Sequence, residues 1–168
     1  MQIDNVIQPM LFLDIESSSP DEEGYPICIA WTTADKAIKS SLIIPEDDWT
    51  DWDFSYQHSH GLTREHLFEQ GQSALDVIKE LSSDLAHFTV YVDGLDFDHE
   101  WLERLFASFN ADLPFELMPI KLHPGGIHYE QFLREREELL QDHGLSGFNA
   151  ENNVYIMMKI FERLQTLE

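Results

Sequence analysis

Two carboxylates stand two residues apart inside an apolar segment near the start of the chain, LFLDIESSS. The apolar residues around Asp14 and Glu16 predict a buried strand, and side chains two apart on a strand point to the same side. The two carboxylates would therefore lie next to each other, and each would raise the pKa of the other. Such a pair is expected either at a solvated strand end or around a divalent cation, because Mg²⁺ binds carboxylate oxygens.

A second group of carboxylates, in VYVDGLDFDHEWL, lies between another short apolar strand and the helix that follows it. It consists of Asp93, Asp96 and Asp98, the last at the start of the helix. A carboxylate there interacts favourably with the helix dipole and caps free amide groups, which would be a structural role for Asp98. In the functional alternative, this strand lies beside the first one, and Asp98 shares a metal site with Asp14 and Glu16.

The elements that would position these groups follow from the spacing of apolar residues. Strands are predicted over residues 10–15, 26–33, 39–44, 89–92 and 117–122, and helices over 73–86, 98–109, 129–140 and 149–164. The first three strands form an antiparallel meander, while residues 45–60 are expected to be an acidic, aromatic loop. Gly61 and Thr63 predict a tight turn and a short helix that points Leu62 and Leu67 inward. This order indicates an α/β fold, with a mixed β-sheet flanked by helices.

Composition narrows the class of protein. The 168 residues are 43% hydrophobic and carry a formal charge of −22, with a single cysteine, Cys28. This length predicts one domain over residues 1–168. The chain shows neither a long apolar stretch nor a signal peptide, which predicts a cytoplasmic protein without a membrane segment. The negative charge repels long duplex nucleic acid, and the alternating charges of residues 130–138 are typical of a solvated helix face.

The order of these motifs resembles the DEDD superfamily of 3′–5′ exonucleases. The resemblance rests on D-x-E at Asp14 and Glu16, on the GLT turn that follows, and on FDHEWL around Asp98. It implies a ribonuclease H-like fold in which the antiparallel meander is joined to parallel strands. It also implies phosphodiester hydrolysis with two Mg²⁺ or Mn²⁺ ions, for which Asp14, Glu16 and Asp98 match metal-binding carboxylates. Ile15 and Ser17 would then contact the terminal nucleotide.

The stretch FNAENN departs from the family pattern. Phe148 replaces the histidine that serves as general base, Asn153 replaces the aspartate that is the fourth metal ligand, and Asn149 stands where a second branch has tyrosine. Asn153 is neutral and would hold the second ion more weakly, while Phe148 cannot accept a proton from water. The candidate replacement base is His143, predicted in the loop before this helix. Further candidates are Glu151, His123 and His128.

The resemblance and the departures together predict a 3′–5′ exonuclease with reduced activity on short single-stranded DNA or RNA, or on a nucleotide. The alternative is a catalytically inactive module of the same fold that binds a protein or nucleotide partner. A third reading is an acidic α/β domain without metal, in which Asp14, Glu16 and Asp98 are scattered in space. The family also suggests a homodimer. The aromatic residues of 45–60 would stack on bases or pack within their own loop.

Overall fold

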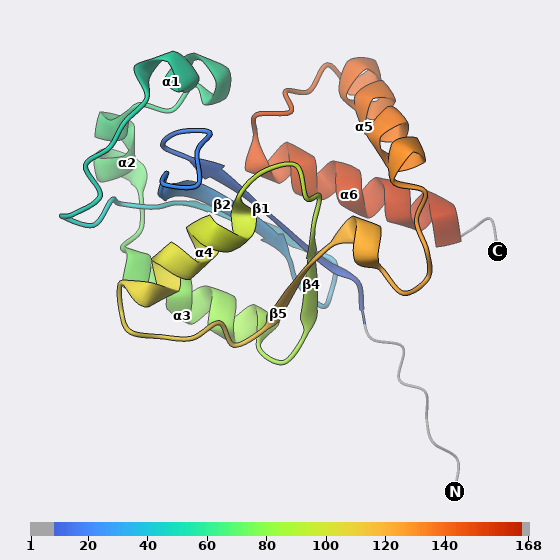
Figure 1. Ribbon diagram of the computed structural model, residues 1–168, viewed down its shortest axis with the longest axis horizontal. Coiled ribbons are helices and arrows are strands. Elements are labelled where there is room, and N and C mark those ends of the chain that lie inside the picture. The colour runs from blue at the N-terminus through green and yellow to red at the C-terminus, as the bar shows by residue number, and fades with distance from the viewer. Residues whose placement is uncertain (1–8, 166–168) are drawn as a thin grey trace, which may run out of the picture.

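The computed structural model describes residues 9–165. At its centre is a five-stranded sheet with the strand order β3-β2-β1-β4-β5 (Figure 1). The strands are β1 (Leu11–Ser17), β2 (Pro26–Thr32), β3 (Ile38–Leu42), β4 (Thr89–Val92) and β5 (Glu116–Pro119). The ends of the predicted domain, residues 1–8 and 166–168, lie outside the described part of the chain.

The sheet is mixed, as the sequence predicted. β1 pairs with β2, and β2 pairs with β3, in antiparallel register, which confirms the meander. β1 pairs with β4, and β4 pairs with β5, in parallel register. Phe12 lies opposite Tyr91, so the same register continued past the end of β4 brings Asp93 level with Asp14. The parallel pairing therefore joins two acidic segments that are far apart in the sequence.

Helices cover both faces of the sheet (Figure 1). They are α1 (Phe54–His60), α2 (Arg64–Gln70), α3 (Ala74–Leu85), α4 (Asp98–Ala107), α5 (Tyr129–His143) and α6 (Ala150–Gln165). One core packs α3 and α4 against Leu13 and Ile15 of β1, and the other packs α5 and α6 against Phe12. Because side chains alternate along a strand, Asp14 and Glu16 lie on the same side of β1 as α5 and α6.

Three segments differ from the sequence prediction. The expected loop over 45–60 contains α1, which buries none of its residues and therefore has no apolar periodicity that could predict it. The strand predicted to reach Leu122 ends at Pro119, where the missing amide donor of proline stops the pairing and a 3₁₀ turn follows. Helix α5 continues to His143 and ends at Gly144, which has a φ of 62°. His143 is therefore the last helical residue and not part of a loop.

The short helix predicted after Gly61 is α2. Thr63 accepts a hydrogen bond from the backbone amide of His66, and Leu67 is fully buried, as the sequence predicted. Leu62 packs against the same core as Leu67. Within residues 9–165, the helices are too short or too polar for any of them to cross a membrane.

Candidate metal centre

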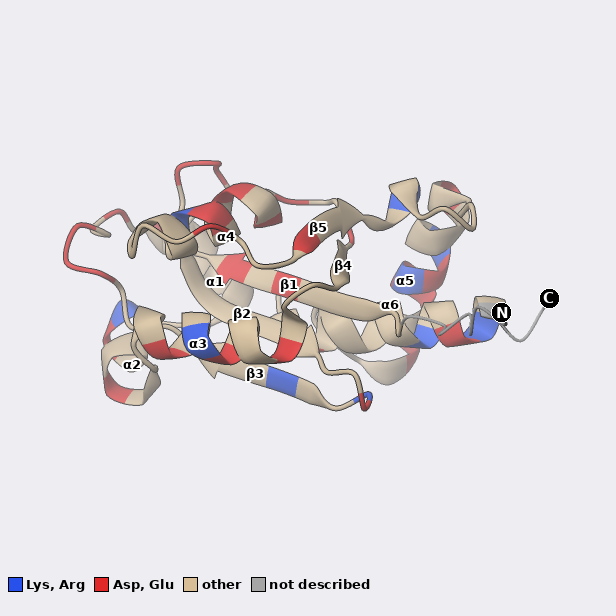
Figure 2. Ribbon diagram, turned by 90° about the horizontal axis from the view of Figure 1, so that it is seen from below, with Lys and Arg blue, Asp and Glu red and all other residues tan. Residues whose placement is uncertain are grey.

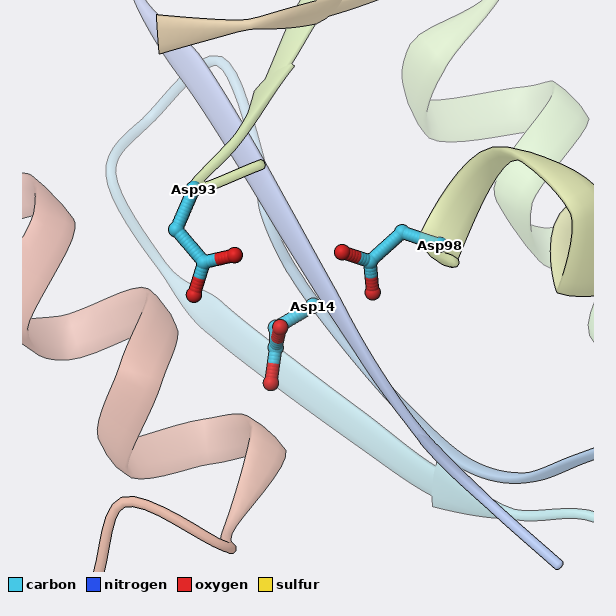
Figure 3. Close-up of side chains that lie close together, drawn as sticks. All are labelled: Asp14, Asp93 and Asp98. Carbon is cyan, nitrogen blue, oxygen red and sulfur yellow. The ribbon is translucent and has the colours of Figure 1, made fainter. Parts of the chain in front are cut away.

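Three carboxylates from separate elements converge at one end of the sheet. Asp14 comes from β1, Asp93 directly follows β4, and Asp98 is the first residue of α4. Each offers an oxygen atom, and these oxygens lie within 4.8 Å of one another. Figure 3 shows the three side chains pointing toward one another. Their exposed fractions are 1%, 2% and 1%, so the fold gathers three acids in its interior.

Backbone hydrogen bonds hold two of these carboxylates in place. The amide of Ile15 donates to Asp98 Oδ1 at 3.2 Å, and the amide of Leu95 donates to Asp93 Oδ1 at 3.0 Å. The N-cap of α4 is Phe97, whose side chain makes no capping bond. Asp98 thus bonds to β1 across the sheet end, and this contact is not the helix-capping role that the sequence allowed.

Burial and mutual repulsion make the ionised state of this cluster costly. Burial, followed by the charges of Asp98 and Asp93, raises the pKa of Asp14 well above its ordinary value. Burial, followed by the charges of Asp93 and Asp96, does the same to the pKa of Asp98. Asp98 Oδ2 is buried without a hydrogen-bond partner among the described residues. These residues fit Mg²⁺ or Mn²⁺, since a hard cation would bind the free oxygen and compensate the charge.

Glu16 lies beside this centre. It is 5% exposed, and the converging oxygens found within residues 9–165 do not include its carboxylate. Burial, followed by the charge of Asp96, raises the pKa of Glu16 to about 8, while Arg136 lowers it. Glu16 therefore faces the acidic cleft next to the three carboxylates and stands at the rim of the centre.

A cleft of about 600 Å³ opens at Glu16. Its wall also includes Tyr56 from α1, Arg136 from α5 and Phe148 from the loop before α6. The rings of Tyr56 and Phe148 meet edge to face with centroids 6.3 Å apart, and Phe148 is 49% exposed. An exposed ring next to a charged cleft can contact a flat ligand such as a nucleobase.

Asn153 extends from α6 to the carboxylates. Its Nδ2 donates to Asp14 Oδ2 at 2.9 Å and to the carbonyl oxygen of Gly147 at 2.8 Å. Its Oδ1 accepts a hydrogen bond from Arg136 Nη2 at 3.3 Å. The residue is 5% exposed and lies beside the cluster, where the sequence motif placed it. The group that it presents to Asp14, however, is a hydrogen-bond donor.

Within residues 9–165, the other predicted site residues contribute no side chain to the converging oxygens. His143 is exposed, and its ring meets Tyr155 edge to face with centroids 6.4 Å apart. Ser17 is fully buried, and its hydroxyl donates to the carbonyl of Ser19 at 2.5 Å. Ile15 takes part through its backbone amide, while its side chain is in the core on the opposite side.

The alternative bases also lie elsewhere. Glu151 accepts a hydrogen bond from the hydroxyl of Ser40 at 3.1 Å. His123 and His128 line a separate cavity, next to Phe161. None of these three lines the cleft that contains Glu16, as far as the described residues show.

Two residues of the site were not predicted as site residues from the sequence. Asp93 follows β4, and the parallel pairing of β4 with β1 is the signal that could have found it. Arg136 belongs to residues 130–138, which were expected to be a solvated face. It is half-buried and lines the cleft instead, because α5 packs on α6 along one core.

Comparison with known proteins gives matches among solved structures. Neither a protein-family model nor a curated protein matches the chain. The zinc-bound complex of E. coli exonuclease I with single-stranded DNA has a TM-score of 0.70 at 16% identity and covers 96% of this chain and 41% of that one. The E. coli enzyme with a dA16 oligonucleotide has a TM-score of 0.65 at 16% identity, over 88% and 38%. A product-bound structure of exonuclease I has a TM-score of 0.65 at 16% identity, over 95% and 44%.

The likeness concerns the fold. This chain spans about two-fifths of the length of the exonuclease I structures that it matches, with 41% of the zinc-bound complex covered. The mixed sheet and its flanking helices match in these structures, which confirms the predicted ribonuclease H-like architecture. The chain therefore has the fold found in exonuclease I, and it carries three buried carboxylates at one end of the sheet.

Proposed function

We propose that this chain is a 3′–5′ exonuclease with reduced activity, dependent on a divalent metal, that hydrolyses phosphodiester bonds at the ends of short single-stranded DNA or RNA. The convergence of Asp14, Asp93 and Asp98 in the fold of exonuclease I carries this proposal. The buried oxygen Asp98 Oδ2, unpartnered among the described residues, supports a ligand role for the group.

In this function, Asp14, Asp93 and Asp98 bind Mg²⁺ or Mn²⁺, and Glu16 stands at the rim. The bound metal supplies activation of water and stabilisation of the charge that develops on the leaving oxygen. The protein holds the carboxylates of the metal centre in place. Two backbone amides hold Asp93 and Asp98, so these carboxylates need little rearrangement when charge develops.

The activity is expected to be reduced because the position of the general base is occupied by Phe148. A general base contributes ~10²–10⁴-fold to the rate. His143 stays the proposed replacement, although its imidazole packs against Tyr155. Ile15 and Ser17 stay the proposed contacts of the terminal nucleotide.

Charge supports a short substrate. In Figure 2, acidic residues occupy β1, α4 and the loops beside them, and the few Lys and Arg residues lie among further acidic residues on the helices and on β3. The formal charge of −22 opposes a long polyanion, so a short single strand or a nucleotide fits better. Tyr56 and Phe148 offer rings to a base at the cleft. The E. coli enzyme has been solved with single-stranded DNA, which supports the same class of ligand here.

A second candidate function is favoured by Asn153. Its amide group already donates to Asp14, and this internal bond suits an inactive module of the exonuclease fold that binds a nucleotide or a protein partner. For either function we expect a cytoplasmic homodimer. The single cysteine is compatible with a reducing compartment.

A nuclease assay separates the two functions. Short single strands of DNA and RNA, labelled at the 5′ end, are incubated with Mn²⁺ and protein. Wild type and the exposed control Asp112→Asn should shorten both strands from the 3′ end, while Asp98→Asn should leave them intact. Equal products from Asp98→Asn would refute the metal-dependent function. Binding of Mn²⁺ without any product from wild type would favour the inactive module.

A further inference from the structure

Arg136 brings a positive charge into the acidic cleft. It extends from α5, is half-buried, and lines the cleft together with Glu16 and Asp96. Burial raises the pKa of Glu16, Asp93 and Asp96, and the guanidinium charge opposes the rise at each. Arg136 therefore lowers the pKa of two carboxylates that line the cleft, Glu16 and Asp96, and of Asp93 beside it.

The chain leaves room for this guanidinium at Gly147. A Cβ atom on Gly147 would lie 2.9 Å from Arg136 Nη2, which is closer than Cβ atoms normally approach other atoms. The carbonyl oxygen of Gly147 also accepts the hydrogen bond from Asn153. One glycine thus gives space to the arginine and fixes the asparagine beside it.

Three partners determine how the Asn153 amide is turned. The carboxylate of Asp14 and the carbonyl of Gly147 accept hydrogen bonds, whereas Arg136 can only donate. The amino group must therefore face Asp14, and the amide oxygen must face Arg136. In the reverse orientation, the amino group would face the donor of Arg136, and the amide oxygen would face the acceptors of Asp14 and Gly147. The buried hydrogen bonds would then be lost.

This orientation places an amino group where a second metal ion would need an oxygen ligand. Two-metal phosphodiesterase centres hold their ions ~3.5–4 Å apart, each surrounded by oxygen ligands. The three converging carboxylates can surround one ion. On the side of α6, Asp14 Oδ2 meets the Asn153 amino group at 2.9 Å, where a cation would require an oxygen ligand.

We propose that a single divalent cation binds at Asp14, Asp93 and Asp98, beside the cleft, and that Arg136 in the cleft takes the place of a second cation by binding the phosphate of the substrate. This inference rests on the proposed function and names its phosphate ligand. A guanidinium has five N–H donors and binds phosphate oxygens in pairs. Asn153 is a positioning residue, which holds one N–H group of Arg136 and leaves the others to the cleft.

Manganese stoichiometry tests the first half of the inference. Calorimetry on the full chain is expected to give one Mn²⁺ per wild-type chain, with an uncoupled Mn²⁺ spectrum in electron paramagnetic resonance. Arg134→Ala is the matched control, because Arg134 lies on the same helix and is exposed. It should also bind one ion. The double variant Arg136→Ala/Asn153→Asp should bind two, seen as a spin-coupled pair.

Thymidine 5′-monophosphate tests the second half. In saturating Mn²⁺, its dissociation constant should rise about tenfold in Arg136→Ala, the equivalent of ~1.4 kcal/mol. Arg134→Ala should bind it as wild type does. Thermal melting followed by circular dichroism checks that each variant is folded.

The outcomes are distinct from those for the proposed function. Two ions in wild type, one ion in a folded double variant, or an unchanged nucleotide affinity in Arg136→Ala would each overturn the inference and leave the metal-dependent function standing. Wild type that binds no Mn²⁺ would overturn the proposed function itself. If the double variant does not fold, the wild-type stoichiometry and the Arg136→Ala titration still decide.

Discussion

Replacing Asp98 by asparagine is expected to stabilise the protein in the absence of metal. Asp98 is 1% exposed, and its Oδ2 has no hydrogen-bond partner among the described residues. Oxygens of Asp14 and Asp93 lie within 4.8 Å. Asparagine has the same size and keeps an acceptor for the amide of Ile15. Its amino group would add a donor that faces the two remaining carboxylates.

The size of the effect follows from the distances. Two unit charges 4.8 Å apart repel by about 3.5 kcal/mol at an effective dielectric constant of ~20. Burial and the neighbouring acids raise the pKa of both Asp14 and Asp98, so the full repulsion between two ionised carboxylates is an upper bound. We therefore expect Asp98→Asn to add about 1–3 kcal/mol to the free energy of unfolding at pH 8. For a chain of this length, the melting temperature would rise by ~2–4 °C per kcal/mol.

Metal should reverse the order of stability. A ligand at 1,000 times its dissociation constant stabilises a folded protein by ~4.1 kcal/mol, which exceeds the advantage expected for Asp98→Asn. Wild type and the exposed control Asp112→Asn should therefore melt at a higher temperature with Mn²⁺ than with a chelator, whereas Asp98→Asn should show no gain. The assay is thermal unfolding followed by circular dichroism, with and without Mn²⁺.

Two results would refute this reasoning. If Asp98→Asn is less stable than wild type in chelator, the carboxylate contributes favourable contacts and the cluster is not strained by its charge. If Asp98→Asn keeps the full gain from Mn²⁺, the ion binds elsewhere. If Mn²⁺ raises the melting temperature of Asp98→Asn by less than that of wild type, and by the same amount as in Asp112→Asn, the difference reflects net charge alone.

Two further predictions concern α1, beside the cleft. Burial lowers the pKa of His60 from its ordinary value of 6.5, so the unfolded chain gains a proton at higher pH than the folded protein, and the contribution of His60 to stability falls as the pH drops below about 6.5. His60→Gln should remove this contribution, so the stability of the variant relative to wild type should rise as the pH drops from about 7.5 to 5 in urea unfolding, and a constant difference would count against it. Asp53 accepts a hydrogen bond from the amide of Tyr56 at 2.9 Å as the N-cap of α1. Asp53→Ala should lower the free energy of unfolding by about 1 kcal/mol in the same assay, and a loss near zero would show that the cap is dispensable.

The sheet and most helices were predictable because each buries an apolar face with a fixed period. In α3, the buried residues Val77, Ile78, Leu81 and Leu85 follow the spacing of a helix face. Helix α1 buries nothing, so its cap and the glycine after it were the available signals. Elements that pack against the core can be identified from the sequence, whereas a helix that lies on the surface leaves only its ends as evidence.

The site was predictable in part for a different reason. Asp14 and Asp98 were recognised by motif, and their convergence contradicts a scattered arrangement of these two acids. Asp93 carries no motif of its own. Its position depends on the register between β1 and β4, which is a contact between distant segments. Glu16 shows the limit of spacing as evidence. It shares a strand face with Asp14, yet the three converging oxygens found among the described residues do not include it.

The meaning of Asn153 could not be read from its own position in the sequence. A neutral residue in place of an aspartate indicates a weaker metal ligand, and that was the prediction. How Asn153 meets Asp14 depends on which end of the amide faces that carboxylate, and this is decided by Gly147 and by Arg136 on another helix. An aspartate at 153 without other changes would face the same guanidinium and pair with it, so a second ion would still meet competition from Arg136. The neutral amide of Asn153 and the positive charge of Arg136 therefore act together on the chemistry of the cleft.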